Sequence, residues 1–201
     1  VNIGKYSVPT ISYDANGNIL SLERKGYLSN NTFGTIDQLT YTYDQNRLKA
    51  VEDVVTTGGY ADFKNGTTAT TEYSYDANGN MTSDLNKGIT VQYNVLNLPE
   101  LITFENGSTI AYTYAANAQK LTATFTDVPN NSSYDRDYVG GFIYNDSQLE
   151  MFPTAEGRAV PNTSNNGFLI EYHYKDHLGN TRLTFSDRDG SGDIDVVTEV
   201  L

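Results

Sequence analysis

Large apolar and aromatic residues recur two positions apart along much of the chain, between segments rich in Asp, Asn and Gly. Side chains at positions i and i+2 lie on the same face of a β-strand. The spacing therefore predicts strands whose rings share one face, and the clearest pairs are Tyr41/Tyr43, Tyr73/Tyr75, Tyr112/Tyr114 and Tyr172/Tyr174. No segment of about ten residues shows clean helical i, i+3, i+4 spacing, so the sequence predicts little or no helix.

A turn motif follows the second ring at three places, where an Asp precedes a Gly by three positions and Asn follows the Gly. These places are Asp14/Gly17, Asp76/Gly79 and Asp176/Gly179. The Asp side chain can accept backbone N–H groups as an Asx turn, and Gly takes the left-handed position that closes the turn. The sequence thus predicts a repeated strand-turn-strand unit.

Weaker copies of the motif replace the Gly. The turn after Tyr43 is one residue shorter and has Asn46 at the Gly place, and Asn97 takes this place after Tyr93. Asn is the next best residue at positive φ. The copy with Ala115 and Ala118 at the Asp and Gly places predicts an irregular turn.

Other turn signals lie between the repeats. Asn106-Gly107 stands between two alternating runs and predicts a two-residue type I′ hairpin, and 64–66 (Lys-Asn-Gly) is a second hairpin candidate. Gly-, Asn-, Thr- and Pro-rich segments predict loops at 28–35, 56–66, 128–133 and 154–167.

Composition supports a β-structure and limits the partners. The chain has 201 residues, of which 12% are aromatic. Tyr, Thr, Val and Ile are prominent, and these residues fit a pleated, half-buried surface. The net charge of −12 without a basic stripe argues against nucleic acid as a partner. The absence of Cys fits either a cytosolic protein or a large Gram-negative surface protein. No apolar run is long enough for a membrane span.

The chain starts without a basic, apolar signal segment, so we interpret it as an internal fragment of a larger protein. No internal boundary stands out. We therefore expect one β-region over 1–201, with the repeat core at about 11–185 and each unit stabilised mainly by its neighbours.

The repeats resemble those of the YD-repeat, or Rhs (rearrangement hotspot), family. YDANGN occurs at Tyr13 and Tyr75, and YHYKDHLGNTRL at 172–183 is similar to the segment near the end of the Rhs core. Upstream, VGGFIYNDSQLEMFPTAEGRAV at 139–160 is similar to the stretch that precedes it in Bacteroidetes-type members. The resemblance implies an all-β strip of antiparallel hairpins that forms a curved sheet or part of a β-spiral shell.

The resemblance also implies a function. Such shells enclose a C-terminal toxin or effector, so this chain would be a non-catalytic wall segment of a secreted or cell-surface protein. Its partners would be other segments of the parent chain and the effector domain. Open sheet edges also predict self-association. The alternative is a cell-surface β-module whose tyrosines bind carbohydrate or a protein partner.

The best metal candidate is the loop at 187–195. Its oxygen-bearing residues follow part of an EF-hand pattern: Asp187, Asp189, Ser191, Asp193 and Asp195. The closing acid is displaced because the twelfth position is Thr198, with Glu199 one residue late. The sequence therefore predicts at most weak calcium binding or a solvated hairpin loop, and no other cofactor.

Two further sets of residues are weaker candidates. His173, Asp176 and His177 could share a cation, although the repeat makes Asp176 a turn residue. Glu150 and Glu156 could form a carboxylate pair of the glycosidase type, but chance pairs are common in an acidic chain. No nucleophile motif or phosphate loop occurs. We expect no catalytic residue and no enzymatic activity.

Overall fold

The computed structural model describes residues 4–29, 32–56, 62–162 and 166–199. These residues form seventeen strands and no helix, so the all-β prediction is confirmed. Every strand pair is antiparallel and joins strands adjacent in the chain, as a succession of hairpins requires. The chain divides into two compact units, 1–107 and 108–201, and each is described by itself.

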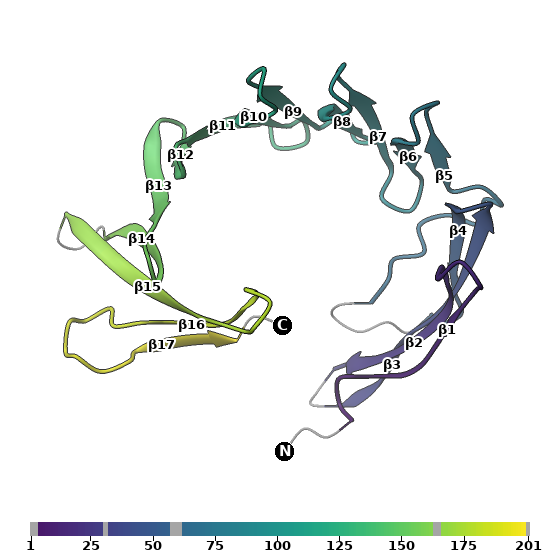
Figure 1. Cartoon of the computed structure of the whole chain (residues 1–201), viewed down its shortest axis with the longest axis horizontal. Helices are drawn as coiled ribbons and strands as arrows, with labels where there is room; N and C mark the ends of the chain where they lie inside the picture. Colours follow the sequence, from purple (N-terminus) through teal and green to yellow (C-terminus); the bar gives the residue numbers. More distant parts are fainter. Residues whose placement is uncertain (1–3, 30–31, 57–61, 163–165, 200–201) are drawn as a thin grey trace. The chain divides into compact units, whose positions relative to one another are not determined.

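The first unit contains two runs of strands (Figure 1). The first run is a four-stranded sheet of β1 (Ser7–Tyr13), β2 (Ile19–Tyr27), β3 (Phe33–Asp44) and β4 (Arg47–Asp53). The second run consists of β5 (Tyr73–Tyr75), β6 (Met81–Asp84), β7 (Ile89–Tyr93) and β8 (Pro99–Phe104). The ladder of paired strands is thus interrupted between β4 and β5.

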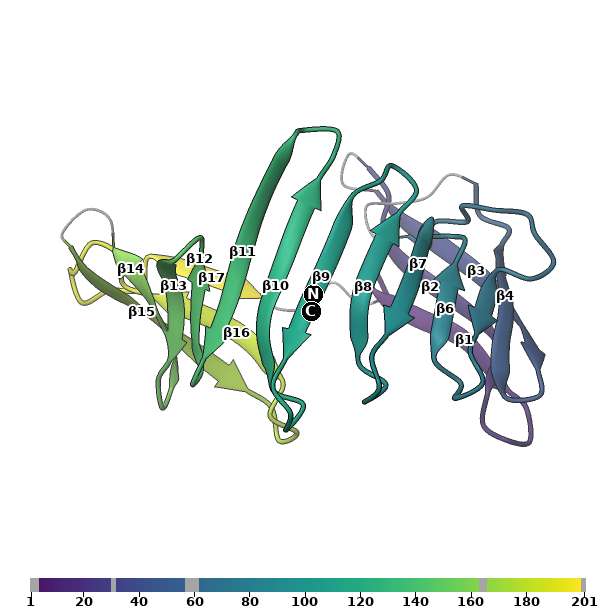
Figure 2. The ribbon, with the colours of Figure 1, turned by 90° about the horizontal axis from the view of Figure 1, so that it is seen from above.

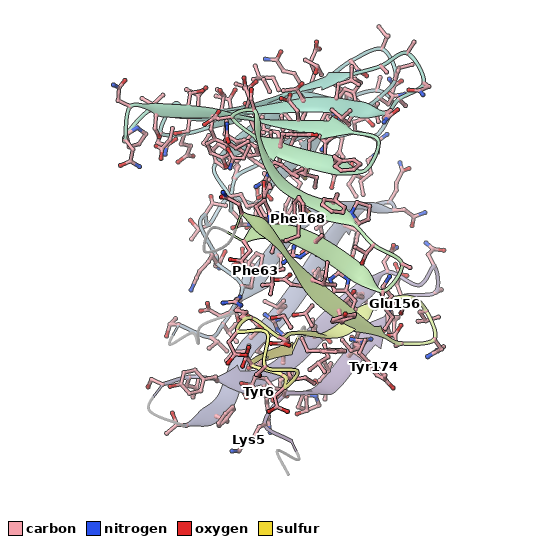
Figure 3. The ribbon with its side chains drawn as sticks, turned by 90° about the vertical axis from the view of Figure 1, so that its left-hand side faces the viewer. Lys5, Tyr6, Phe63, Glu156, Phe168 and Tyr174 are labelled. Carbon is pink, nitrogen blue, oxygen red and sulfur yellow. The ribbon has the colours of Figure 1, made fainter. Side chains whose placement is uncertain are left out.

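The core of the first unit lies at this interruption. Leu39, Val51 and Tyr73 are buried together there. Partly buried apolar side chains pack around them, namely Leu22, Tyr41, Leu48, Phe63, Tyr75 and Met81. Phe63, labelled in Figure 3, comes from the connection between β4 and β5. The connection therefore adds apolar area that two short strand runs cannot supply alone.

A buried carboxylate fixes this connection to the sheet. The Asp37 side chain in β3 is fully buried, and its Oδ1 accepts a hydrogen bond from the Phe63 N–H at 2.5 Å. Its Oδ2 accepts from Arg24 Nε, also at 2.5 Å. Because a buried charge is costly unless paired and hydrogen-bonded, both partners are needed to retain Asp37 in this position.

The second unit is a continuous succession of antiparallel pairs, whose first strands lie side by side in Figure 2. The strands are β9 (Thr109–Tyr114), β10 (Lys120–Asp127), β11 (Ser132–Val139), β12 (Phe142–Asn145), β13 (Gln148–Pro153), β14 (Gly157–Asn162), β15 (Gly167–Lys175), β16 (Thr181–Ser186) and β17 (Val196–Glu199). The predicted loop at 154–167 was wrong in part, since it contains β14. Alternation is weak there because Gly157 and Pro161 occupy strand positions.

Few side chains of the second unit are deeply buried. Among its described apolar residues, only Ala123 and Ala159 reach full burial. Aromatic rings instead pack in pairs between strands. Phe142–Phe152 at 5.1 Å and Tyr172–Phe185 at 5.3 Å between centroids lie on paired strands, and Phe152–Phe168 at 5.2 Å joins β13 and β15, which flank β14. Such cross-strand pairs are the main unit of stabilisation in a sheet without a covering layer.

The predicted Asx turns are confirmed. Asp14 Oδ1 accepts hydrogen bonds from the backbone N–H groups of Asn16 and Asn18, both at 2.8 Å. Asp76 and Asp176 accept in the same way from the residues two and four positions later. The closing glycines take positive φ: 88° at Gly17, 87° at Gly79 and 86° at Gly179.

The expectation of an irregular turn at Ala115 was wrong. Ala118 N–H donates to Ala115 O at 3.0 Å and Ala115 N–H to Gln119 O at 2.9 Å, as in the Asp/Gly copies. Ala118 takes φ of 68°, a left-handed conformation that is strained for a residue with a Cβ. The pairing of β9 with β10 thus imposes the turn despite the unfavourable residue.

Two other turn predictions need correction. Asn97 has positive φ as predicted, but after Tyr43 this conformation belongs to Gln45 (φ 57°) and not to Asn46. The two-residue loop of that hairpin places its first residue at positive φ. The turn at Asn106-Gly107 was predicted as type I′, which needs positive φ at both residues. Only Gly107 has positive φ, and its N–H donates to Phe104 O, so the turn is of another type.

The hairpin predicted at 64–66 is also absent from the described residues, which form no regular secondary structure there. Gly66 lies so close to the backbone of Asn86 that an added Cβ would be 2.5 Å from the Asn86 carbonyl oxygen. Glycine is required by this close approach and not by a turn.

Candidate functional site

Tyrosine hydroxyls connect successive repeats. In each case the donor is the Tyr that precedes a turn. The acceptor is a backbone carbonyl of the preceding repeat, at or near the start of the strand that follows the turn of that repeat. The three bonds are Tyr43 to Ile19 O at 2.9 Å, Tyr75 to Leu48 O at 2.8 Å and Tyr93 to Met81 O at 2.9 Å. We call these bonds tyrosine latches.

The latches explain why Tyr, and not Phe, precedes these turns. Desolvation by the surrounding side chains raises the pKa of Tyr43, Tyr75 and Tyr93 above the ordinary value, so the hydroxyls remain neutral donors. Sequence reasoning identified the rings only as a packing face. The recurrence of Tyr at this one place was the available signal for a polar role.

Asparagine side chains join two of the repeat pairs. Asn46 Oδ1 accepts from the Nδ2 atoms of Asn16 and Asn18, both at 3.1 Å. Asn97 Oδ1 accepts in the same manner from the Nδ2 atoms of Asn78 and Asn80, both at 2.9 Å. Asn46 and Asn97, which sequence analysis treated as backbone residues, therefore also link neighbouring turns.

Glu72 joins β4 to β5 where the strand ladder is interrupted. Its N–H donates to Lys49 O at 2.8 Å, and its Oε2 accepts from Val51 N–H at 2.8 Å and from Asn86 Nδ2 at 2.7 Å. Glu72 is 1% exposed. The carboxylate thus takes the acceptor position that a neighbouring strand's carbonyl would occupy. We call the region between β4 and β5 the seam.

The acidic loop brings together three of the five predicted metal residues. Asp187, Asp189 and Asp195 each place a carboxylate oxygen within 4.8 Å of the other two. Carboxylate oxygens are the ligands that Ca²⁺ prefers, but the ion requires six to eight oxygens in total. The three carboxylates supply only part of this coordination, so weak calcium binding at the loop stays a prediction.

Backbone hydrogen bonds already occupy much of this loop. Asp187 accepts from Gly190 N–H at 2.7 Å and from Gly192 N–H at 2.9 Å. Asp195 Oδ2 accepts from the N–H groups of Arg188 and Asp189 at 2.6 and 3.0 Å. These bonds hold the backbone of the loop around the carboxylates.

The other two predicted residues of the loop, Ser191 and Asp193, bond to each other. Ser191 Oγ accepts from Asp193 N–H at 3.2 Å, and neither residue belongs to the carboxylate group. The Ser191 side chain, by hydrogen bonding to Asp189, lowers the pKa of that carboxyl below its ordinary value. Asp195, at the ninth position of the loop, joins Asp187 and Asp189 in the carboxylate group.

Two residues of the other candidate sets, Asp176 and Glu150, contact neighbouring arginines. Asp176 accepts from Asn180 and from Arg182 Nε at 2.9 Å, and no other group of three potential metal ligands forms among the described residues. Desolvation raises the pKa of Asp176, but the hydrogen bonds from Asn180, Arg182 and Leu178 outweigh it and lower the pKa to about 2. Glu150 contacts the Arg136 guanidinium at 3.0 Å.

These features define a protein built from antiparallel strand-turn-strand repeats, and tyrosine hydroxyls link successive repeats of its first unit. No family model matches the sequence, and no curated protein does. The described residues contain no helix that is long and apolar enough to cross a membrane.

Solved structures with a similar fold come from Tc toxins. The chain resembles the TcdB2–TccC3–Cdc42 structure (TM-score 0.54, 17% identity), the Photorhabdus luminescens Tc holotoxin pore with a mutated TccC3 (0.53, 15%) and TcdB2–TccC3 (0.55, 16%). These matches cover 93%, 90% and 92% of this chain. The chain spans only 11%, 11% and 12% of those longer chains. The likeness establishes the fold.

Proposed function

We propose that this chain is a non-catalytic wall segment of a large Rhs-like shell, which encloses or presents a C-terminal toxin or effector. The observation that carries the proposal is that the second unit has little buried core. Its described strands pair only with their chain neighbours, and few of its apolar side chains are fully buried. A sheet of this kind is a poor independent domain but suits the wall of a larger container.

The latches support the same role. Each tyrosine latch joins one repeat to the one before it, so the array can be lengthened without a new kind of contact. The fold likeness to Tc toxin components supports the shell interpretation. Partners would then be other segments of the parent chain and its effector, at a secreted or cell-surface location.

The proposal can be tested on the parent protein. Electron microscopy of the full-length parent should show a hollow particle, and limited proteolysis should leave the effector intact while the particle is intact. A parent from which 1–201 has been deleted should release or expose the effector to protease. A matched control deletes the effector alone, and the hollow particle should remain.

A solid particle, or an effector digested equally fast with and without 1–201, would contradict the proposal. The binding-module alternative predicts a different outcome, since the isolated chain would then bind a ligand and the parent would need no cavity.

A further inference from the structure

Two asparagines of the repeat turns stand directly before a glycine. Asn16 precedes Gly17, and Asn78 precedes Gly79. All four residues are exposed, so water reaches them. Because glycine has no Cβ, its backbone nitrogen can approach the preceding side chain without steric hindrance. These two asparagines are therefore open, by sequence, to attack by the backbone nitrogen that follows them.

Such an attack leads to deamidation, a covalent change of the side chain. The Gly79 nitrogen forms a bond to Asn78 Cγ, the bond from Cγ to Nδ2 breaks, and ammonia leaves with the proton of the Gly79 N–H. Water then opens the cyclic imide at either of its carbonyl groups and leaves aspartate or isoaspartate. The reaction therefore needs a Gly79 N–H released from its hydrogen bond and an Asn78 side chain that can rotate onto the nitrogen.

The folded turn meets neither condition. Gly79 N–H donates to Asp76 O at 3.1 Å, which holds the attacking nitrogen. Asn78 Nδ2 donates to Asn97 Oδ1 at 2.9 Å, which holds the side chain. Asn78 N–H donates to Asp76 Oδ1, also at 2.9 Å, which holds the backbone between the two reacting groups. Reaction at Asn78 requires these bonds to open first.

The first repeat has the same arrangement. Gly17 N–H donates to Asp14 O at 3.2 Å, and Asn16 Nδ2 donates to Asn46 Oδ1 at 3.1 Å. In both copies the glycine is held within its own turn, whereas the asparagine side chain is held by the turn of the next repeat. The reactivity of the asparagine thus depends on the contact between two repeats.

We propose that Asn16 and Asn78 are latent deamidation sites, each controlled by the asparagine of the next repeat turn. They stay unmodified while Asn46 and Asn97 hold them, and they deamidate when the two turns separate. The modification then makes the separation permanent, because a carboxylate in place of the Asn78 amide has no N–H to donate and repels the Asn97 Oδ1 acceptor. This inference does not depend on the shell proposal.

Asn80 provides a comparison within the same turn. Its Nδ2 also donates to Asn97 Oδ1, at 2.9 Å, but the following residue is Met81. The Met81 side chain hinders closure of the imide ring. Loss of the Asn97 side chain therefore frees both asparagines, and only Asn78 should react.

The experiment is incubation of the whole chain at mildly alkaline pH, followed by acidic digestion and mass spectrometry of the peptides that contain Asn16, Asn78 and Asn80. The reference is the same chain unfolded in urea. We expect Asn16 and Asn78 to deamidate in the folded chain at least about tenfold more slowly than in urea, because several hydrogen bonds must open before reaction. Equal rates in the folded and unfolded chain would overturn the proposal.

Variants of the controlling residues test each site against the other. Asn97→Gly removes the acceptor and fits the positive φ of 57° at this position. It should accelerate deamidation about fivefold at Asn78 and less than about twofold at Asn16. Asn46→Ala should do the reverse, with acceleration at Asn16 and little change at Asn78.

Asn97→Asp is the conservative control, because its carboxylate keeps an acceptor oxygen and tolerates positive φ. It should leave Asn78 protected. Thermal unfolding followed by circular dichroism shows that each variant is folded at the incubation temperature. Unchanged rates at Asn78 in Asn97→Gly and at Asn16 in Asn46→Ala, or equal acceleration of both sites by either variant, would show that the next repeat does not control the reaction.

Discussion

Ala118→Gly should stabilise the protein, because Ala118 holds a left-handed conformation in the turn between β9 and β10. Its φ is 68°, and its side chain is exposed. A residue with a Cβ is less stable in this conformation by roughly 1–2 kcal/mol. Glycine removes this strain but adds unfolded-state entropy that costs about 0.4–1 kcal/mol. The net gain should be about 0.5–1 kcal/mol.

Thermal unfolding followed by circular dichroism measures this gain. At roughly 2–4 °C per kcal/mol for a chain of this size, Tm should rise by about 1–4 °C. The matched control is Ala116→Gly, which lies in the same exposed turn at a residue without positive φ. This control should lower Tm, since only the entropy term acts.

The converse substitution is Gly17→Ala. Gly17 has φ of 88°, and a Cβ there would meet no atom within 4 Å, so only left-handed strain and the opposing entropy term act. The stability should therefore fall by about 0.5–1 kcal/mol. If Ala118→Gly lowers Tm as much as Ala116→Gly does, the argument from left-handed strain is refuted.

Four further predictions follow from the turns, the acidic loop and the sheet edges. Gly17→Val and Gly79→Val should each destabilise by roughly 1 kcal/mol or more, because a β-branched residue fits poorly at positive φ; unchanged Tm for both would contradict the turn assignment. The pKa of Asp176 is lowered to about 2, below the ordinary 3.8, so its stabilisation is present above about pH 4 and is lost as the pH falls towards 2. Asp176→Asn should reduce this acid sensitivity in a pH series of unfolding curves, and an identical pH dependence would refute the assignment. The dissociation constant for calcium at the loop 187–195, measured by calorimetry, should be no lower than about 10⁻⁴ M. A lower constant that is lost in Asp187→Ala would contradict the prediction of weak binding. The isolated chain should self-associate through open strand edges, more strongly as salt screens its net charge of −12, and a strict monomer in light scattering at high protein and salt concentration would contradict this.

The strands and most turns could be predicted from sequence because both depend on local chemistry. Alternating tyrosines specify a strand face, and Asp14 and Gly17 specify a turn through side-chain acceptance and positive φ. The turn at Ala118 failed this logic, since the paired strands on either side determine its conformation and its residues do not. The loop prediction over β14 failed because Pro161 and Gly157 are permitted in a strand but resemble loop residues in sequence.

The candidate sites depended on contacts that lie far apart in sequence. The three carboxylates of the acidic loop lie within nine residues, so their proximity could be anticipated, although the loop selected Asp195 and not Asp193. Glu72 could not be anticipated. Nothing near it in sequence shows that its carboxylate would lie at Val51, and only the interrupted ladder creates that acceptor position.

The tyrosine latches and the seam have a common physical origin. Where two strands pair fully, backbone hydrogen bonds join the repeats, and a latch adds one further bond. At the seam the ladder is missing, so the Tyr75 hydroxyl and the Glu72 N–H and carboxylate make the hydrogen bonds between β4 and β5. Buried polar groups whose partners are removed are costly, by about 1–3 kcal/mol each. The seam is therefore the place in the first unit where loss of one side chain should disturb the junction of two repeats most.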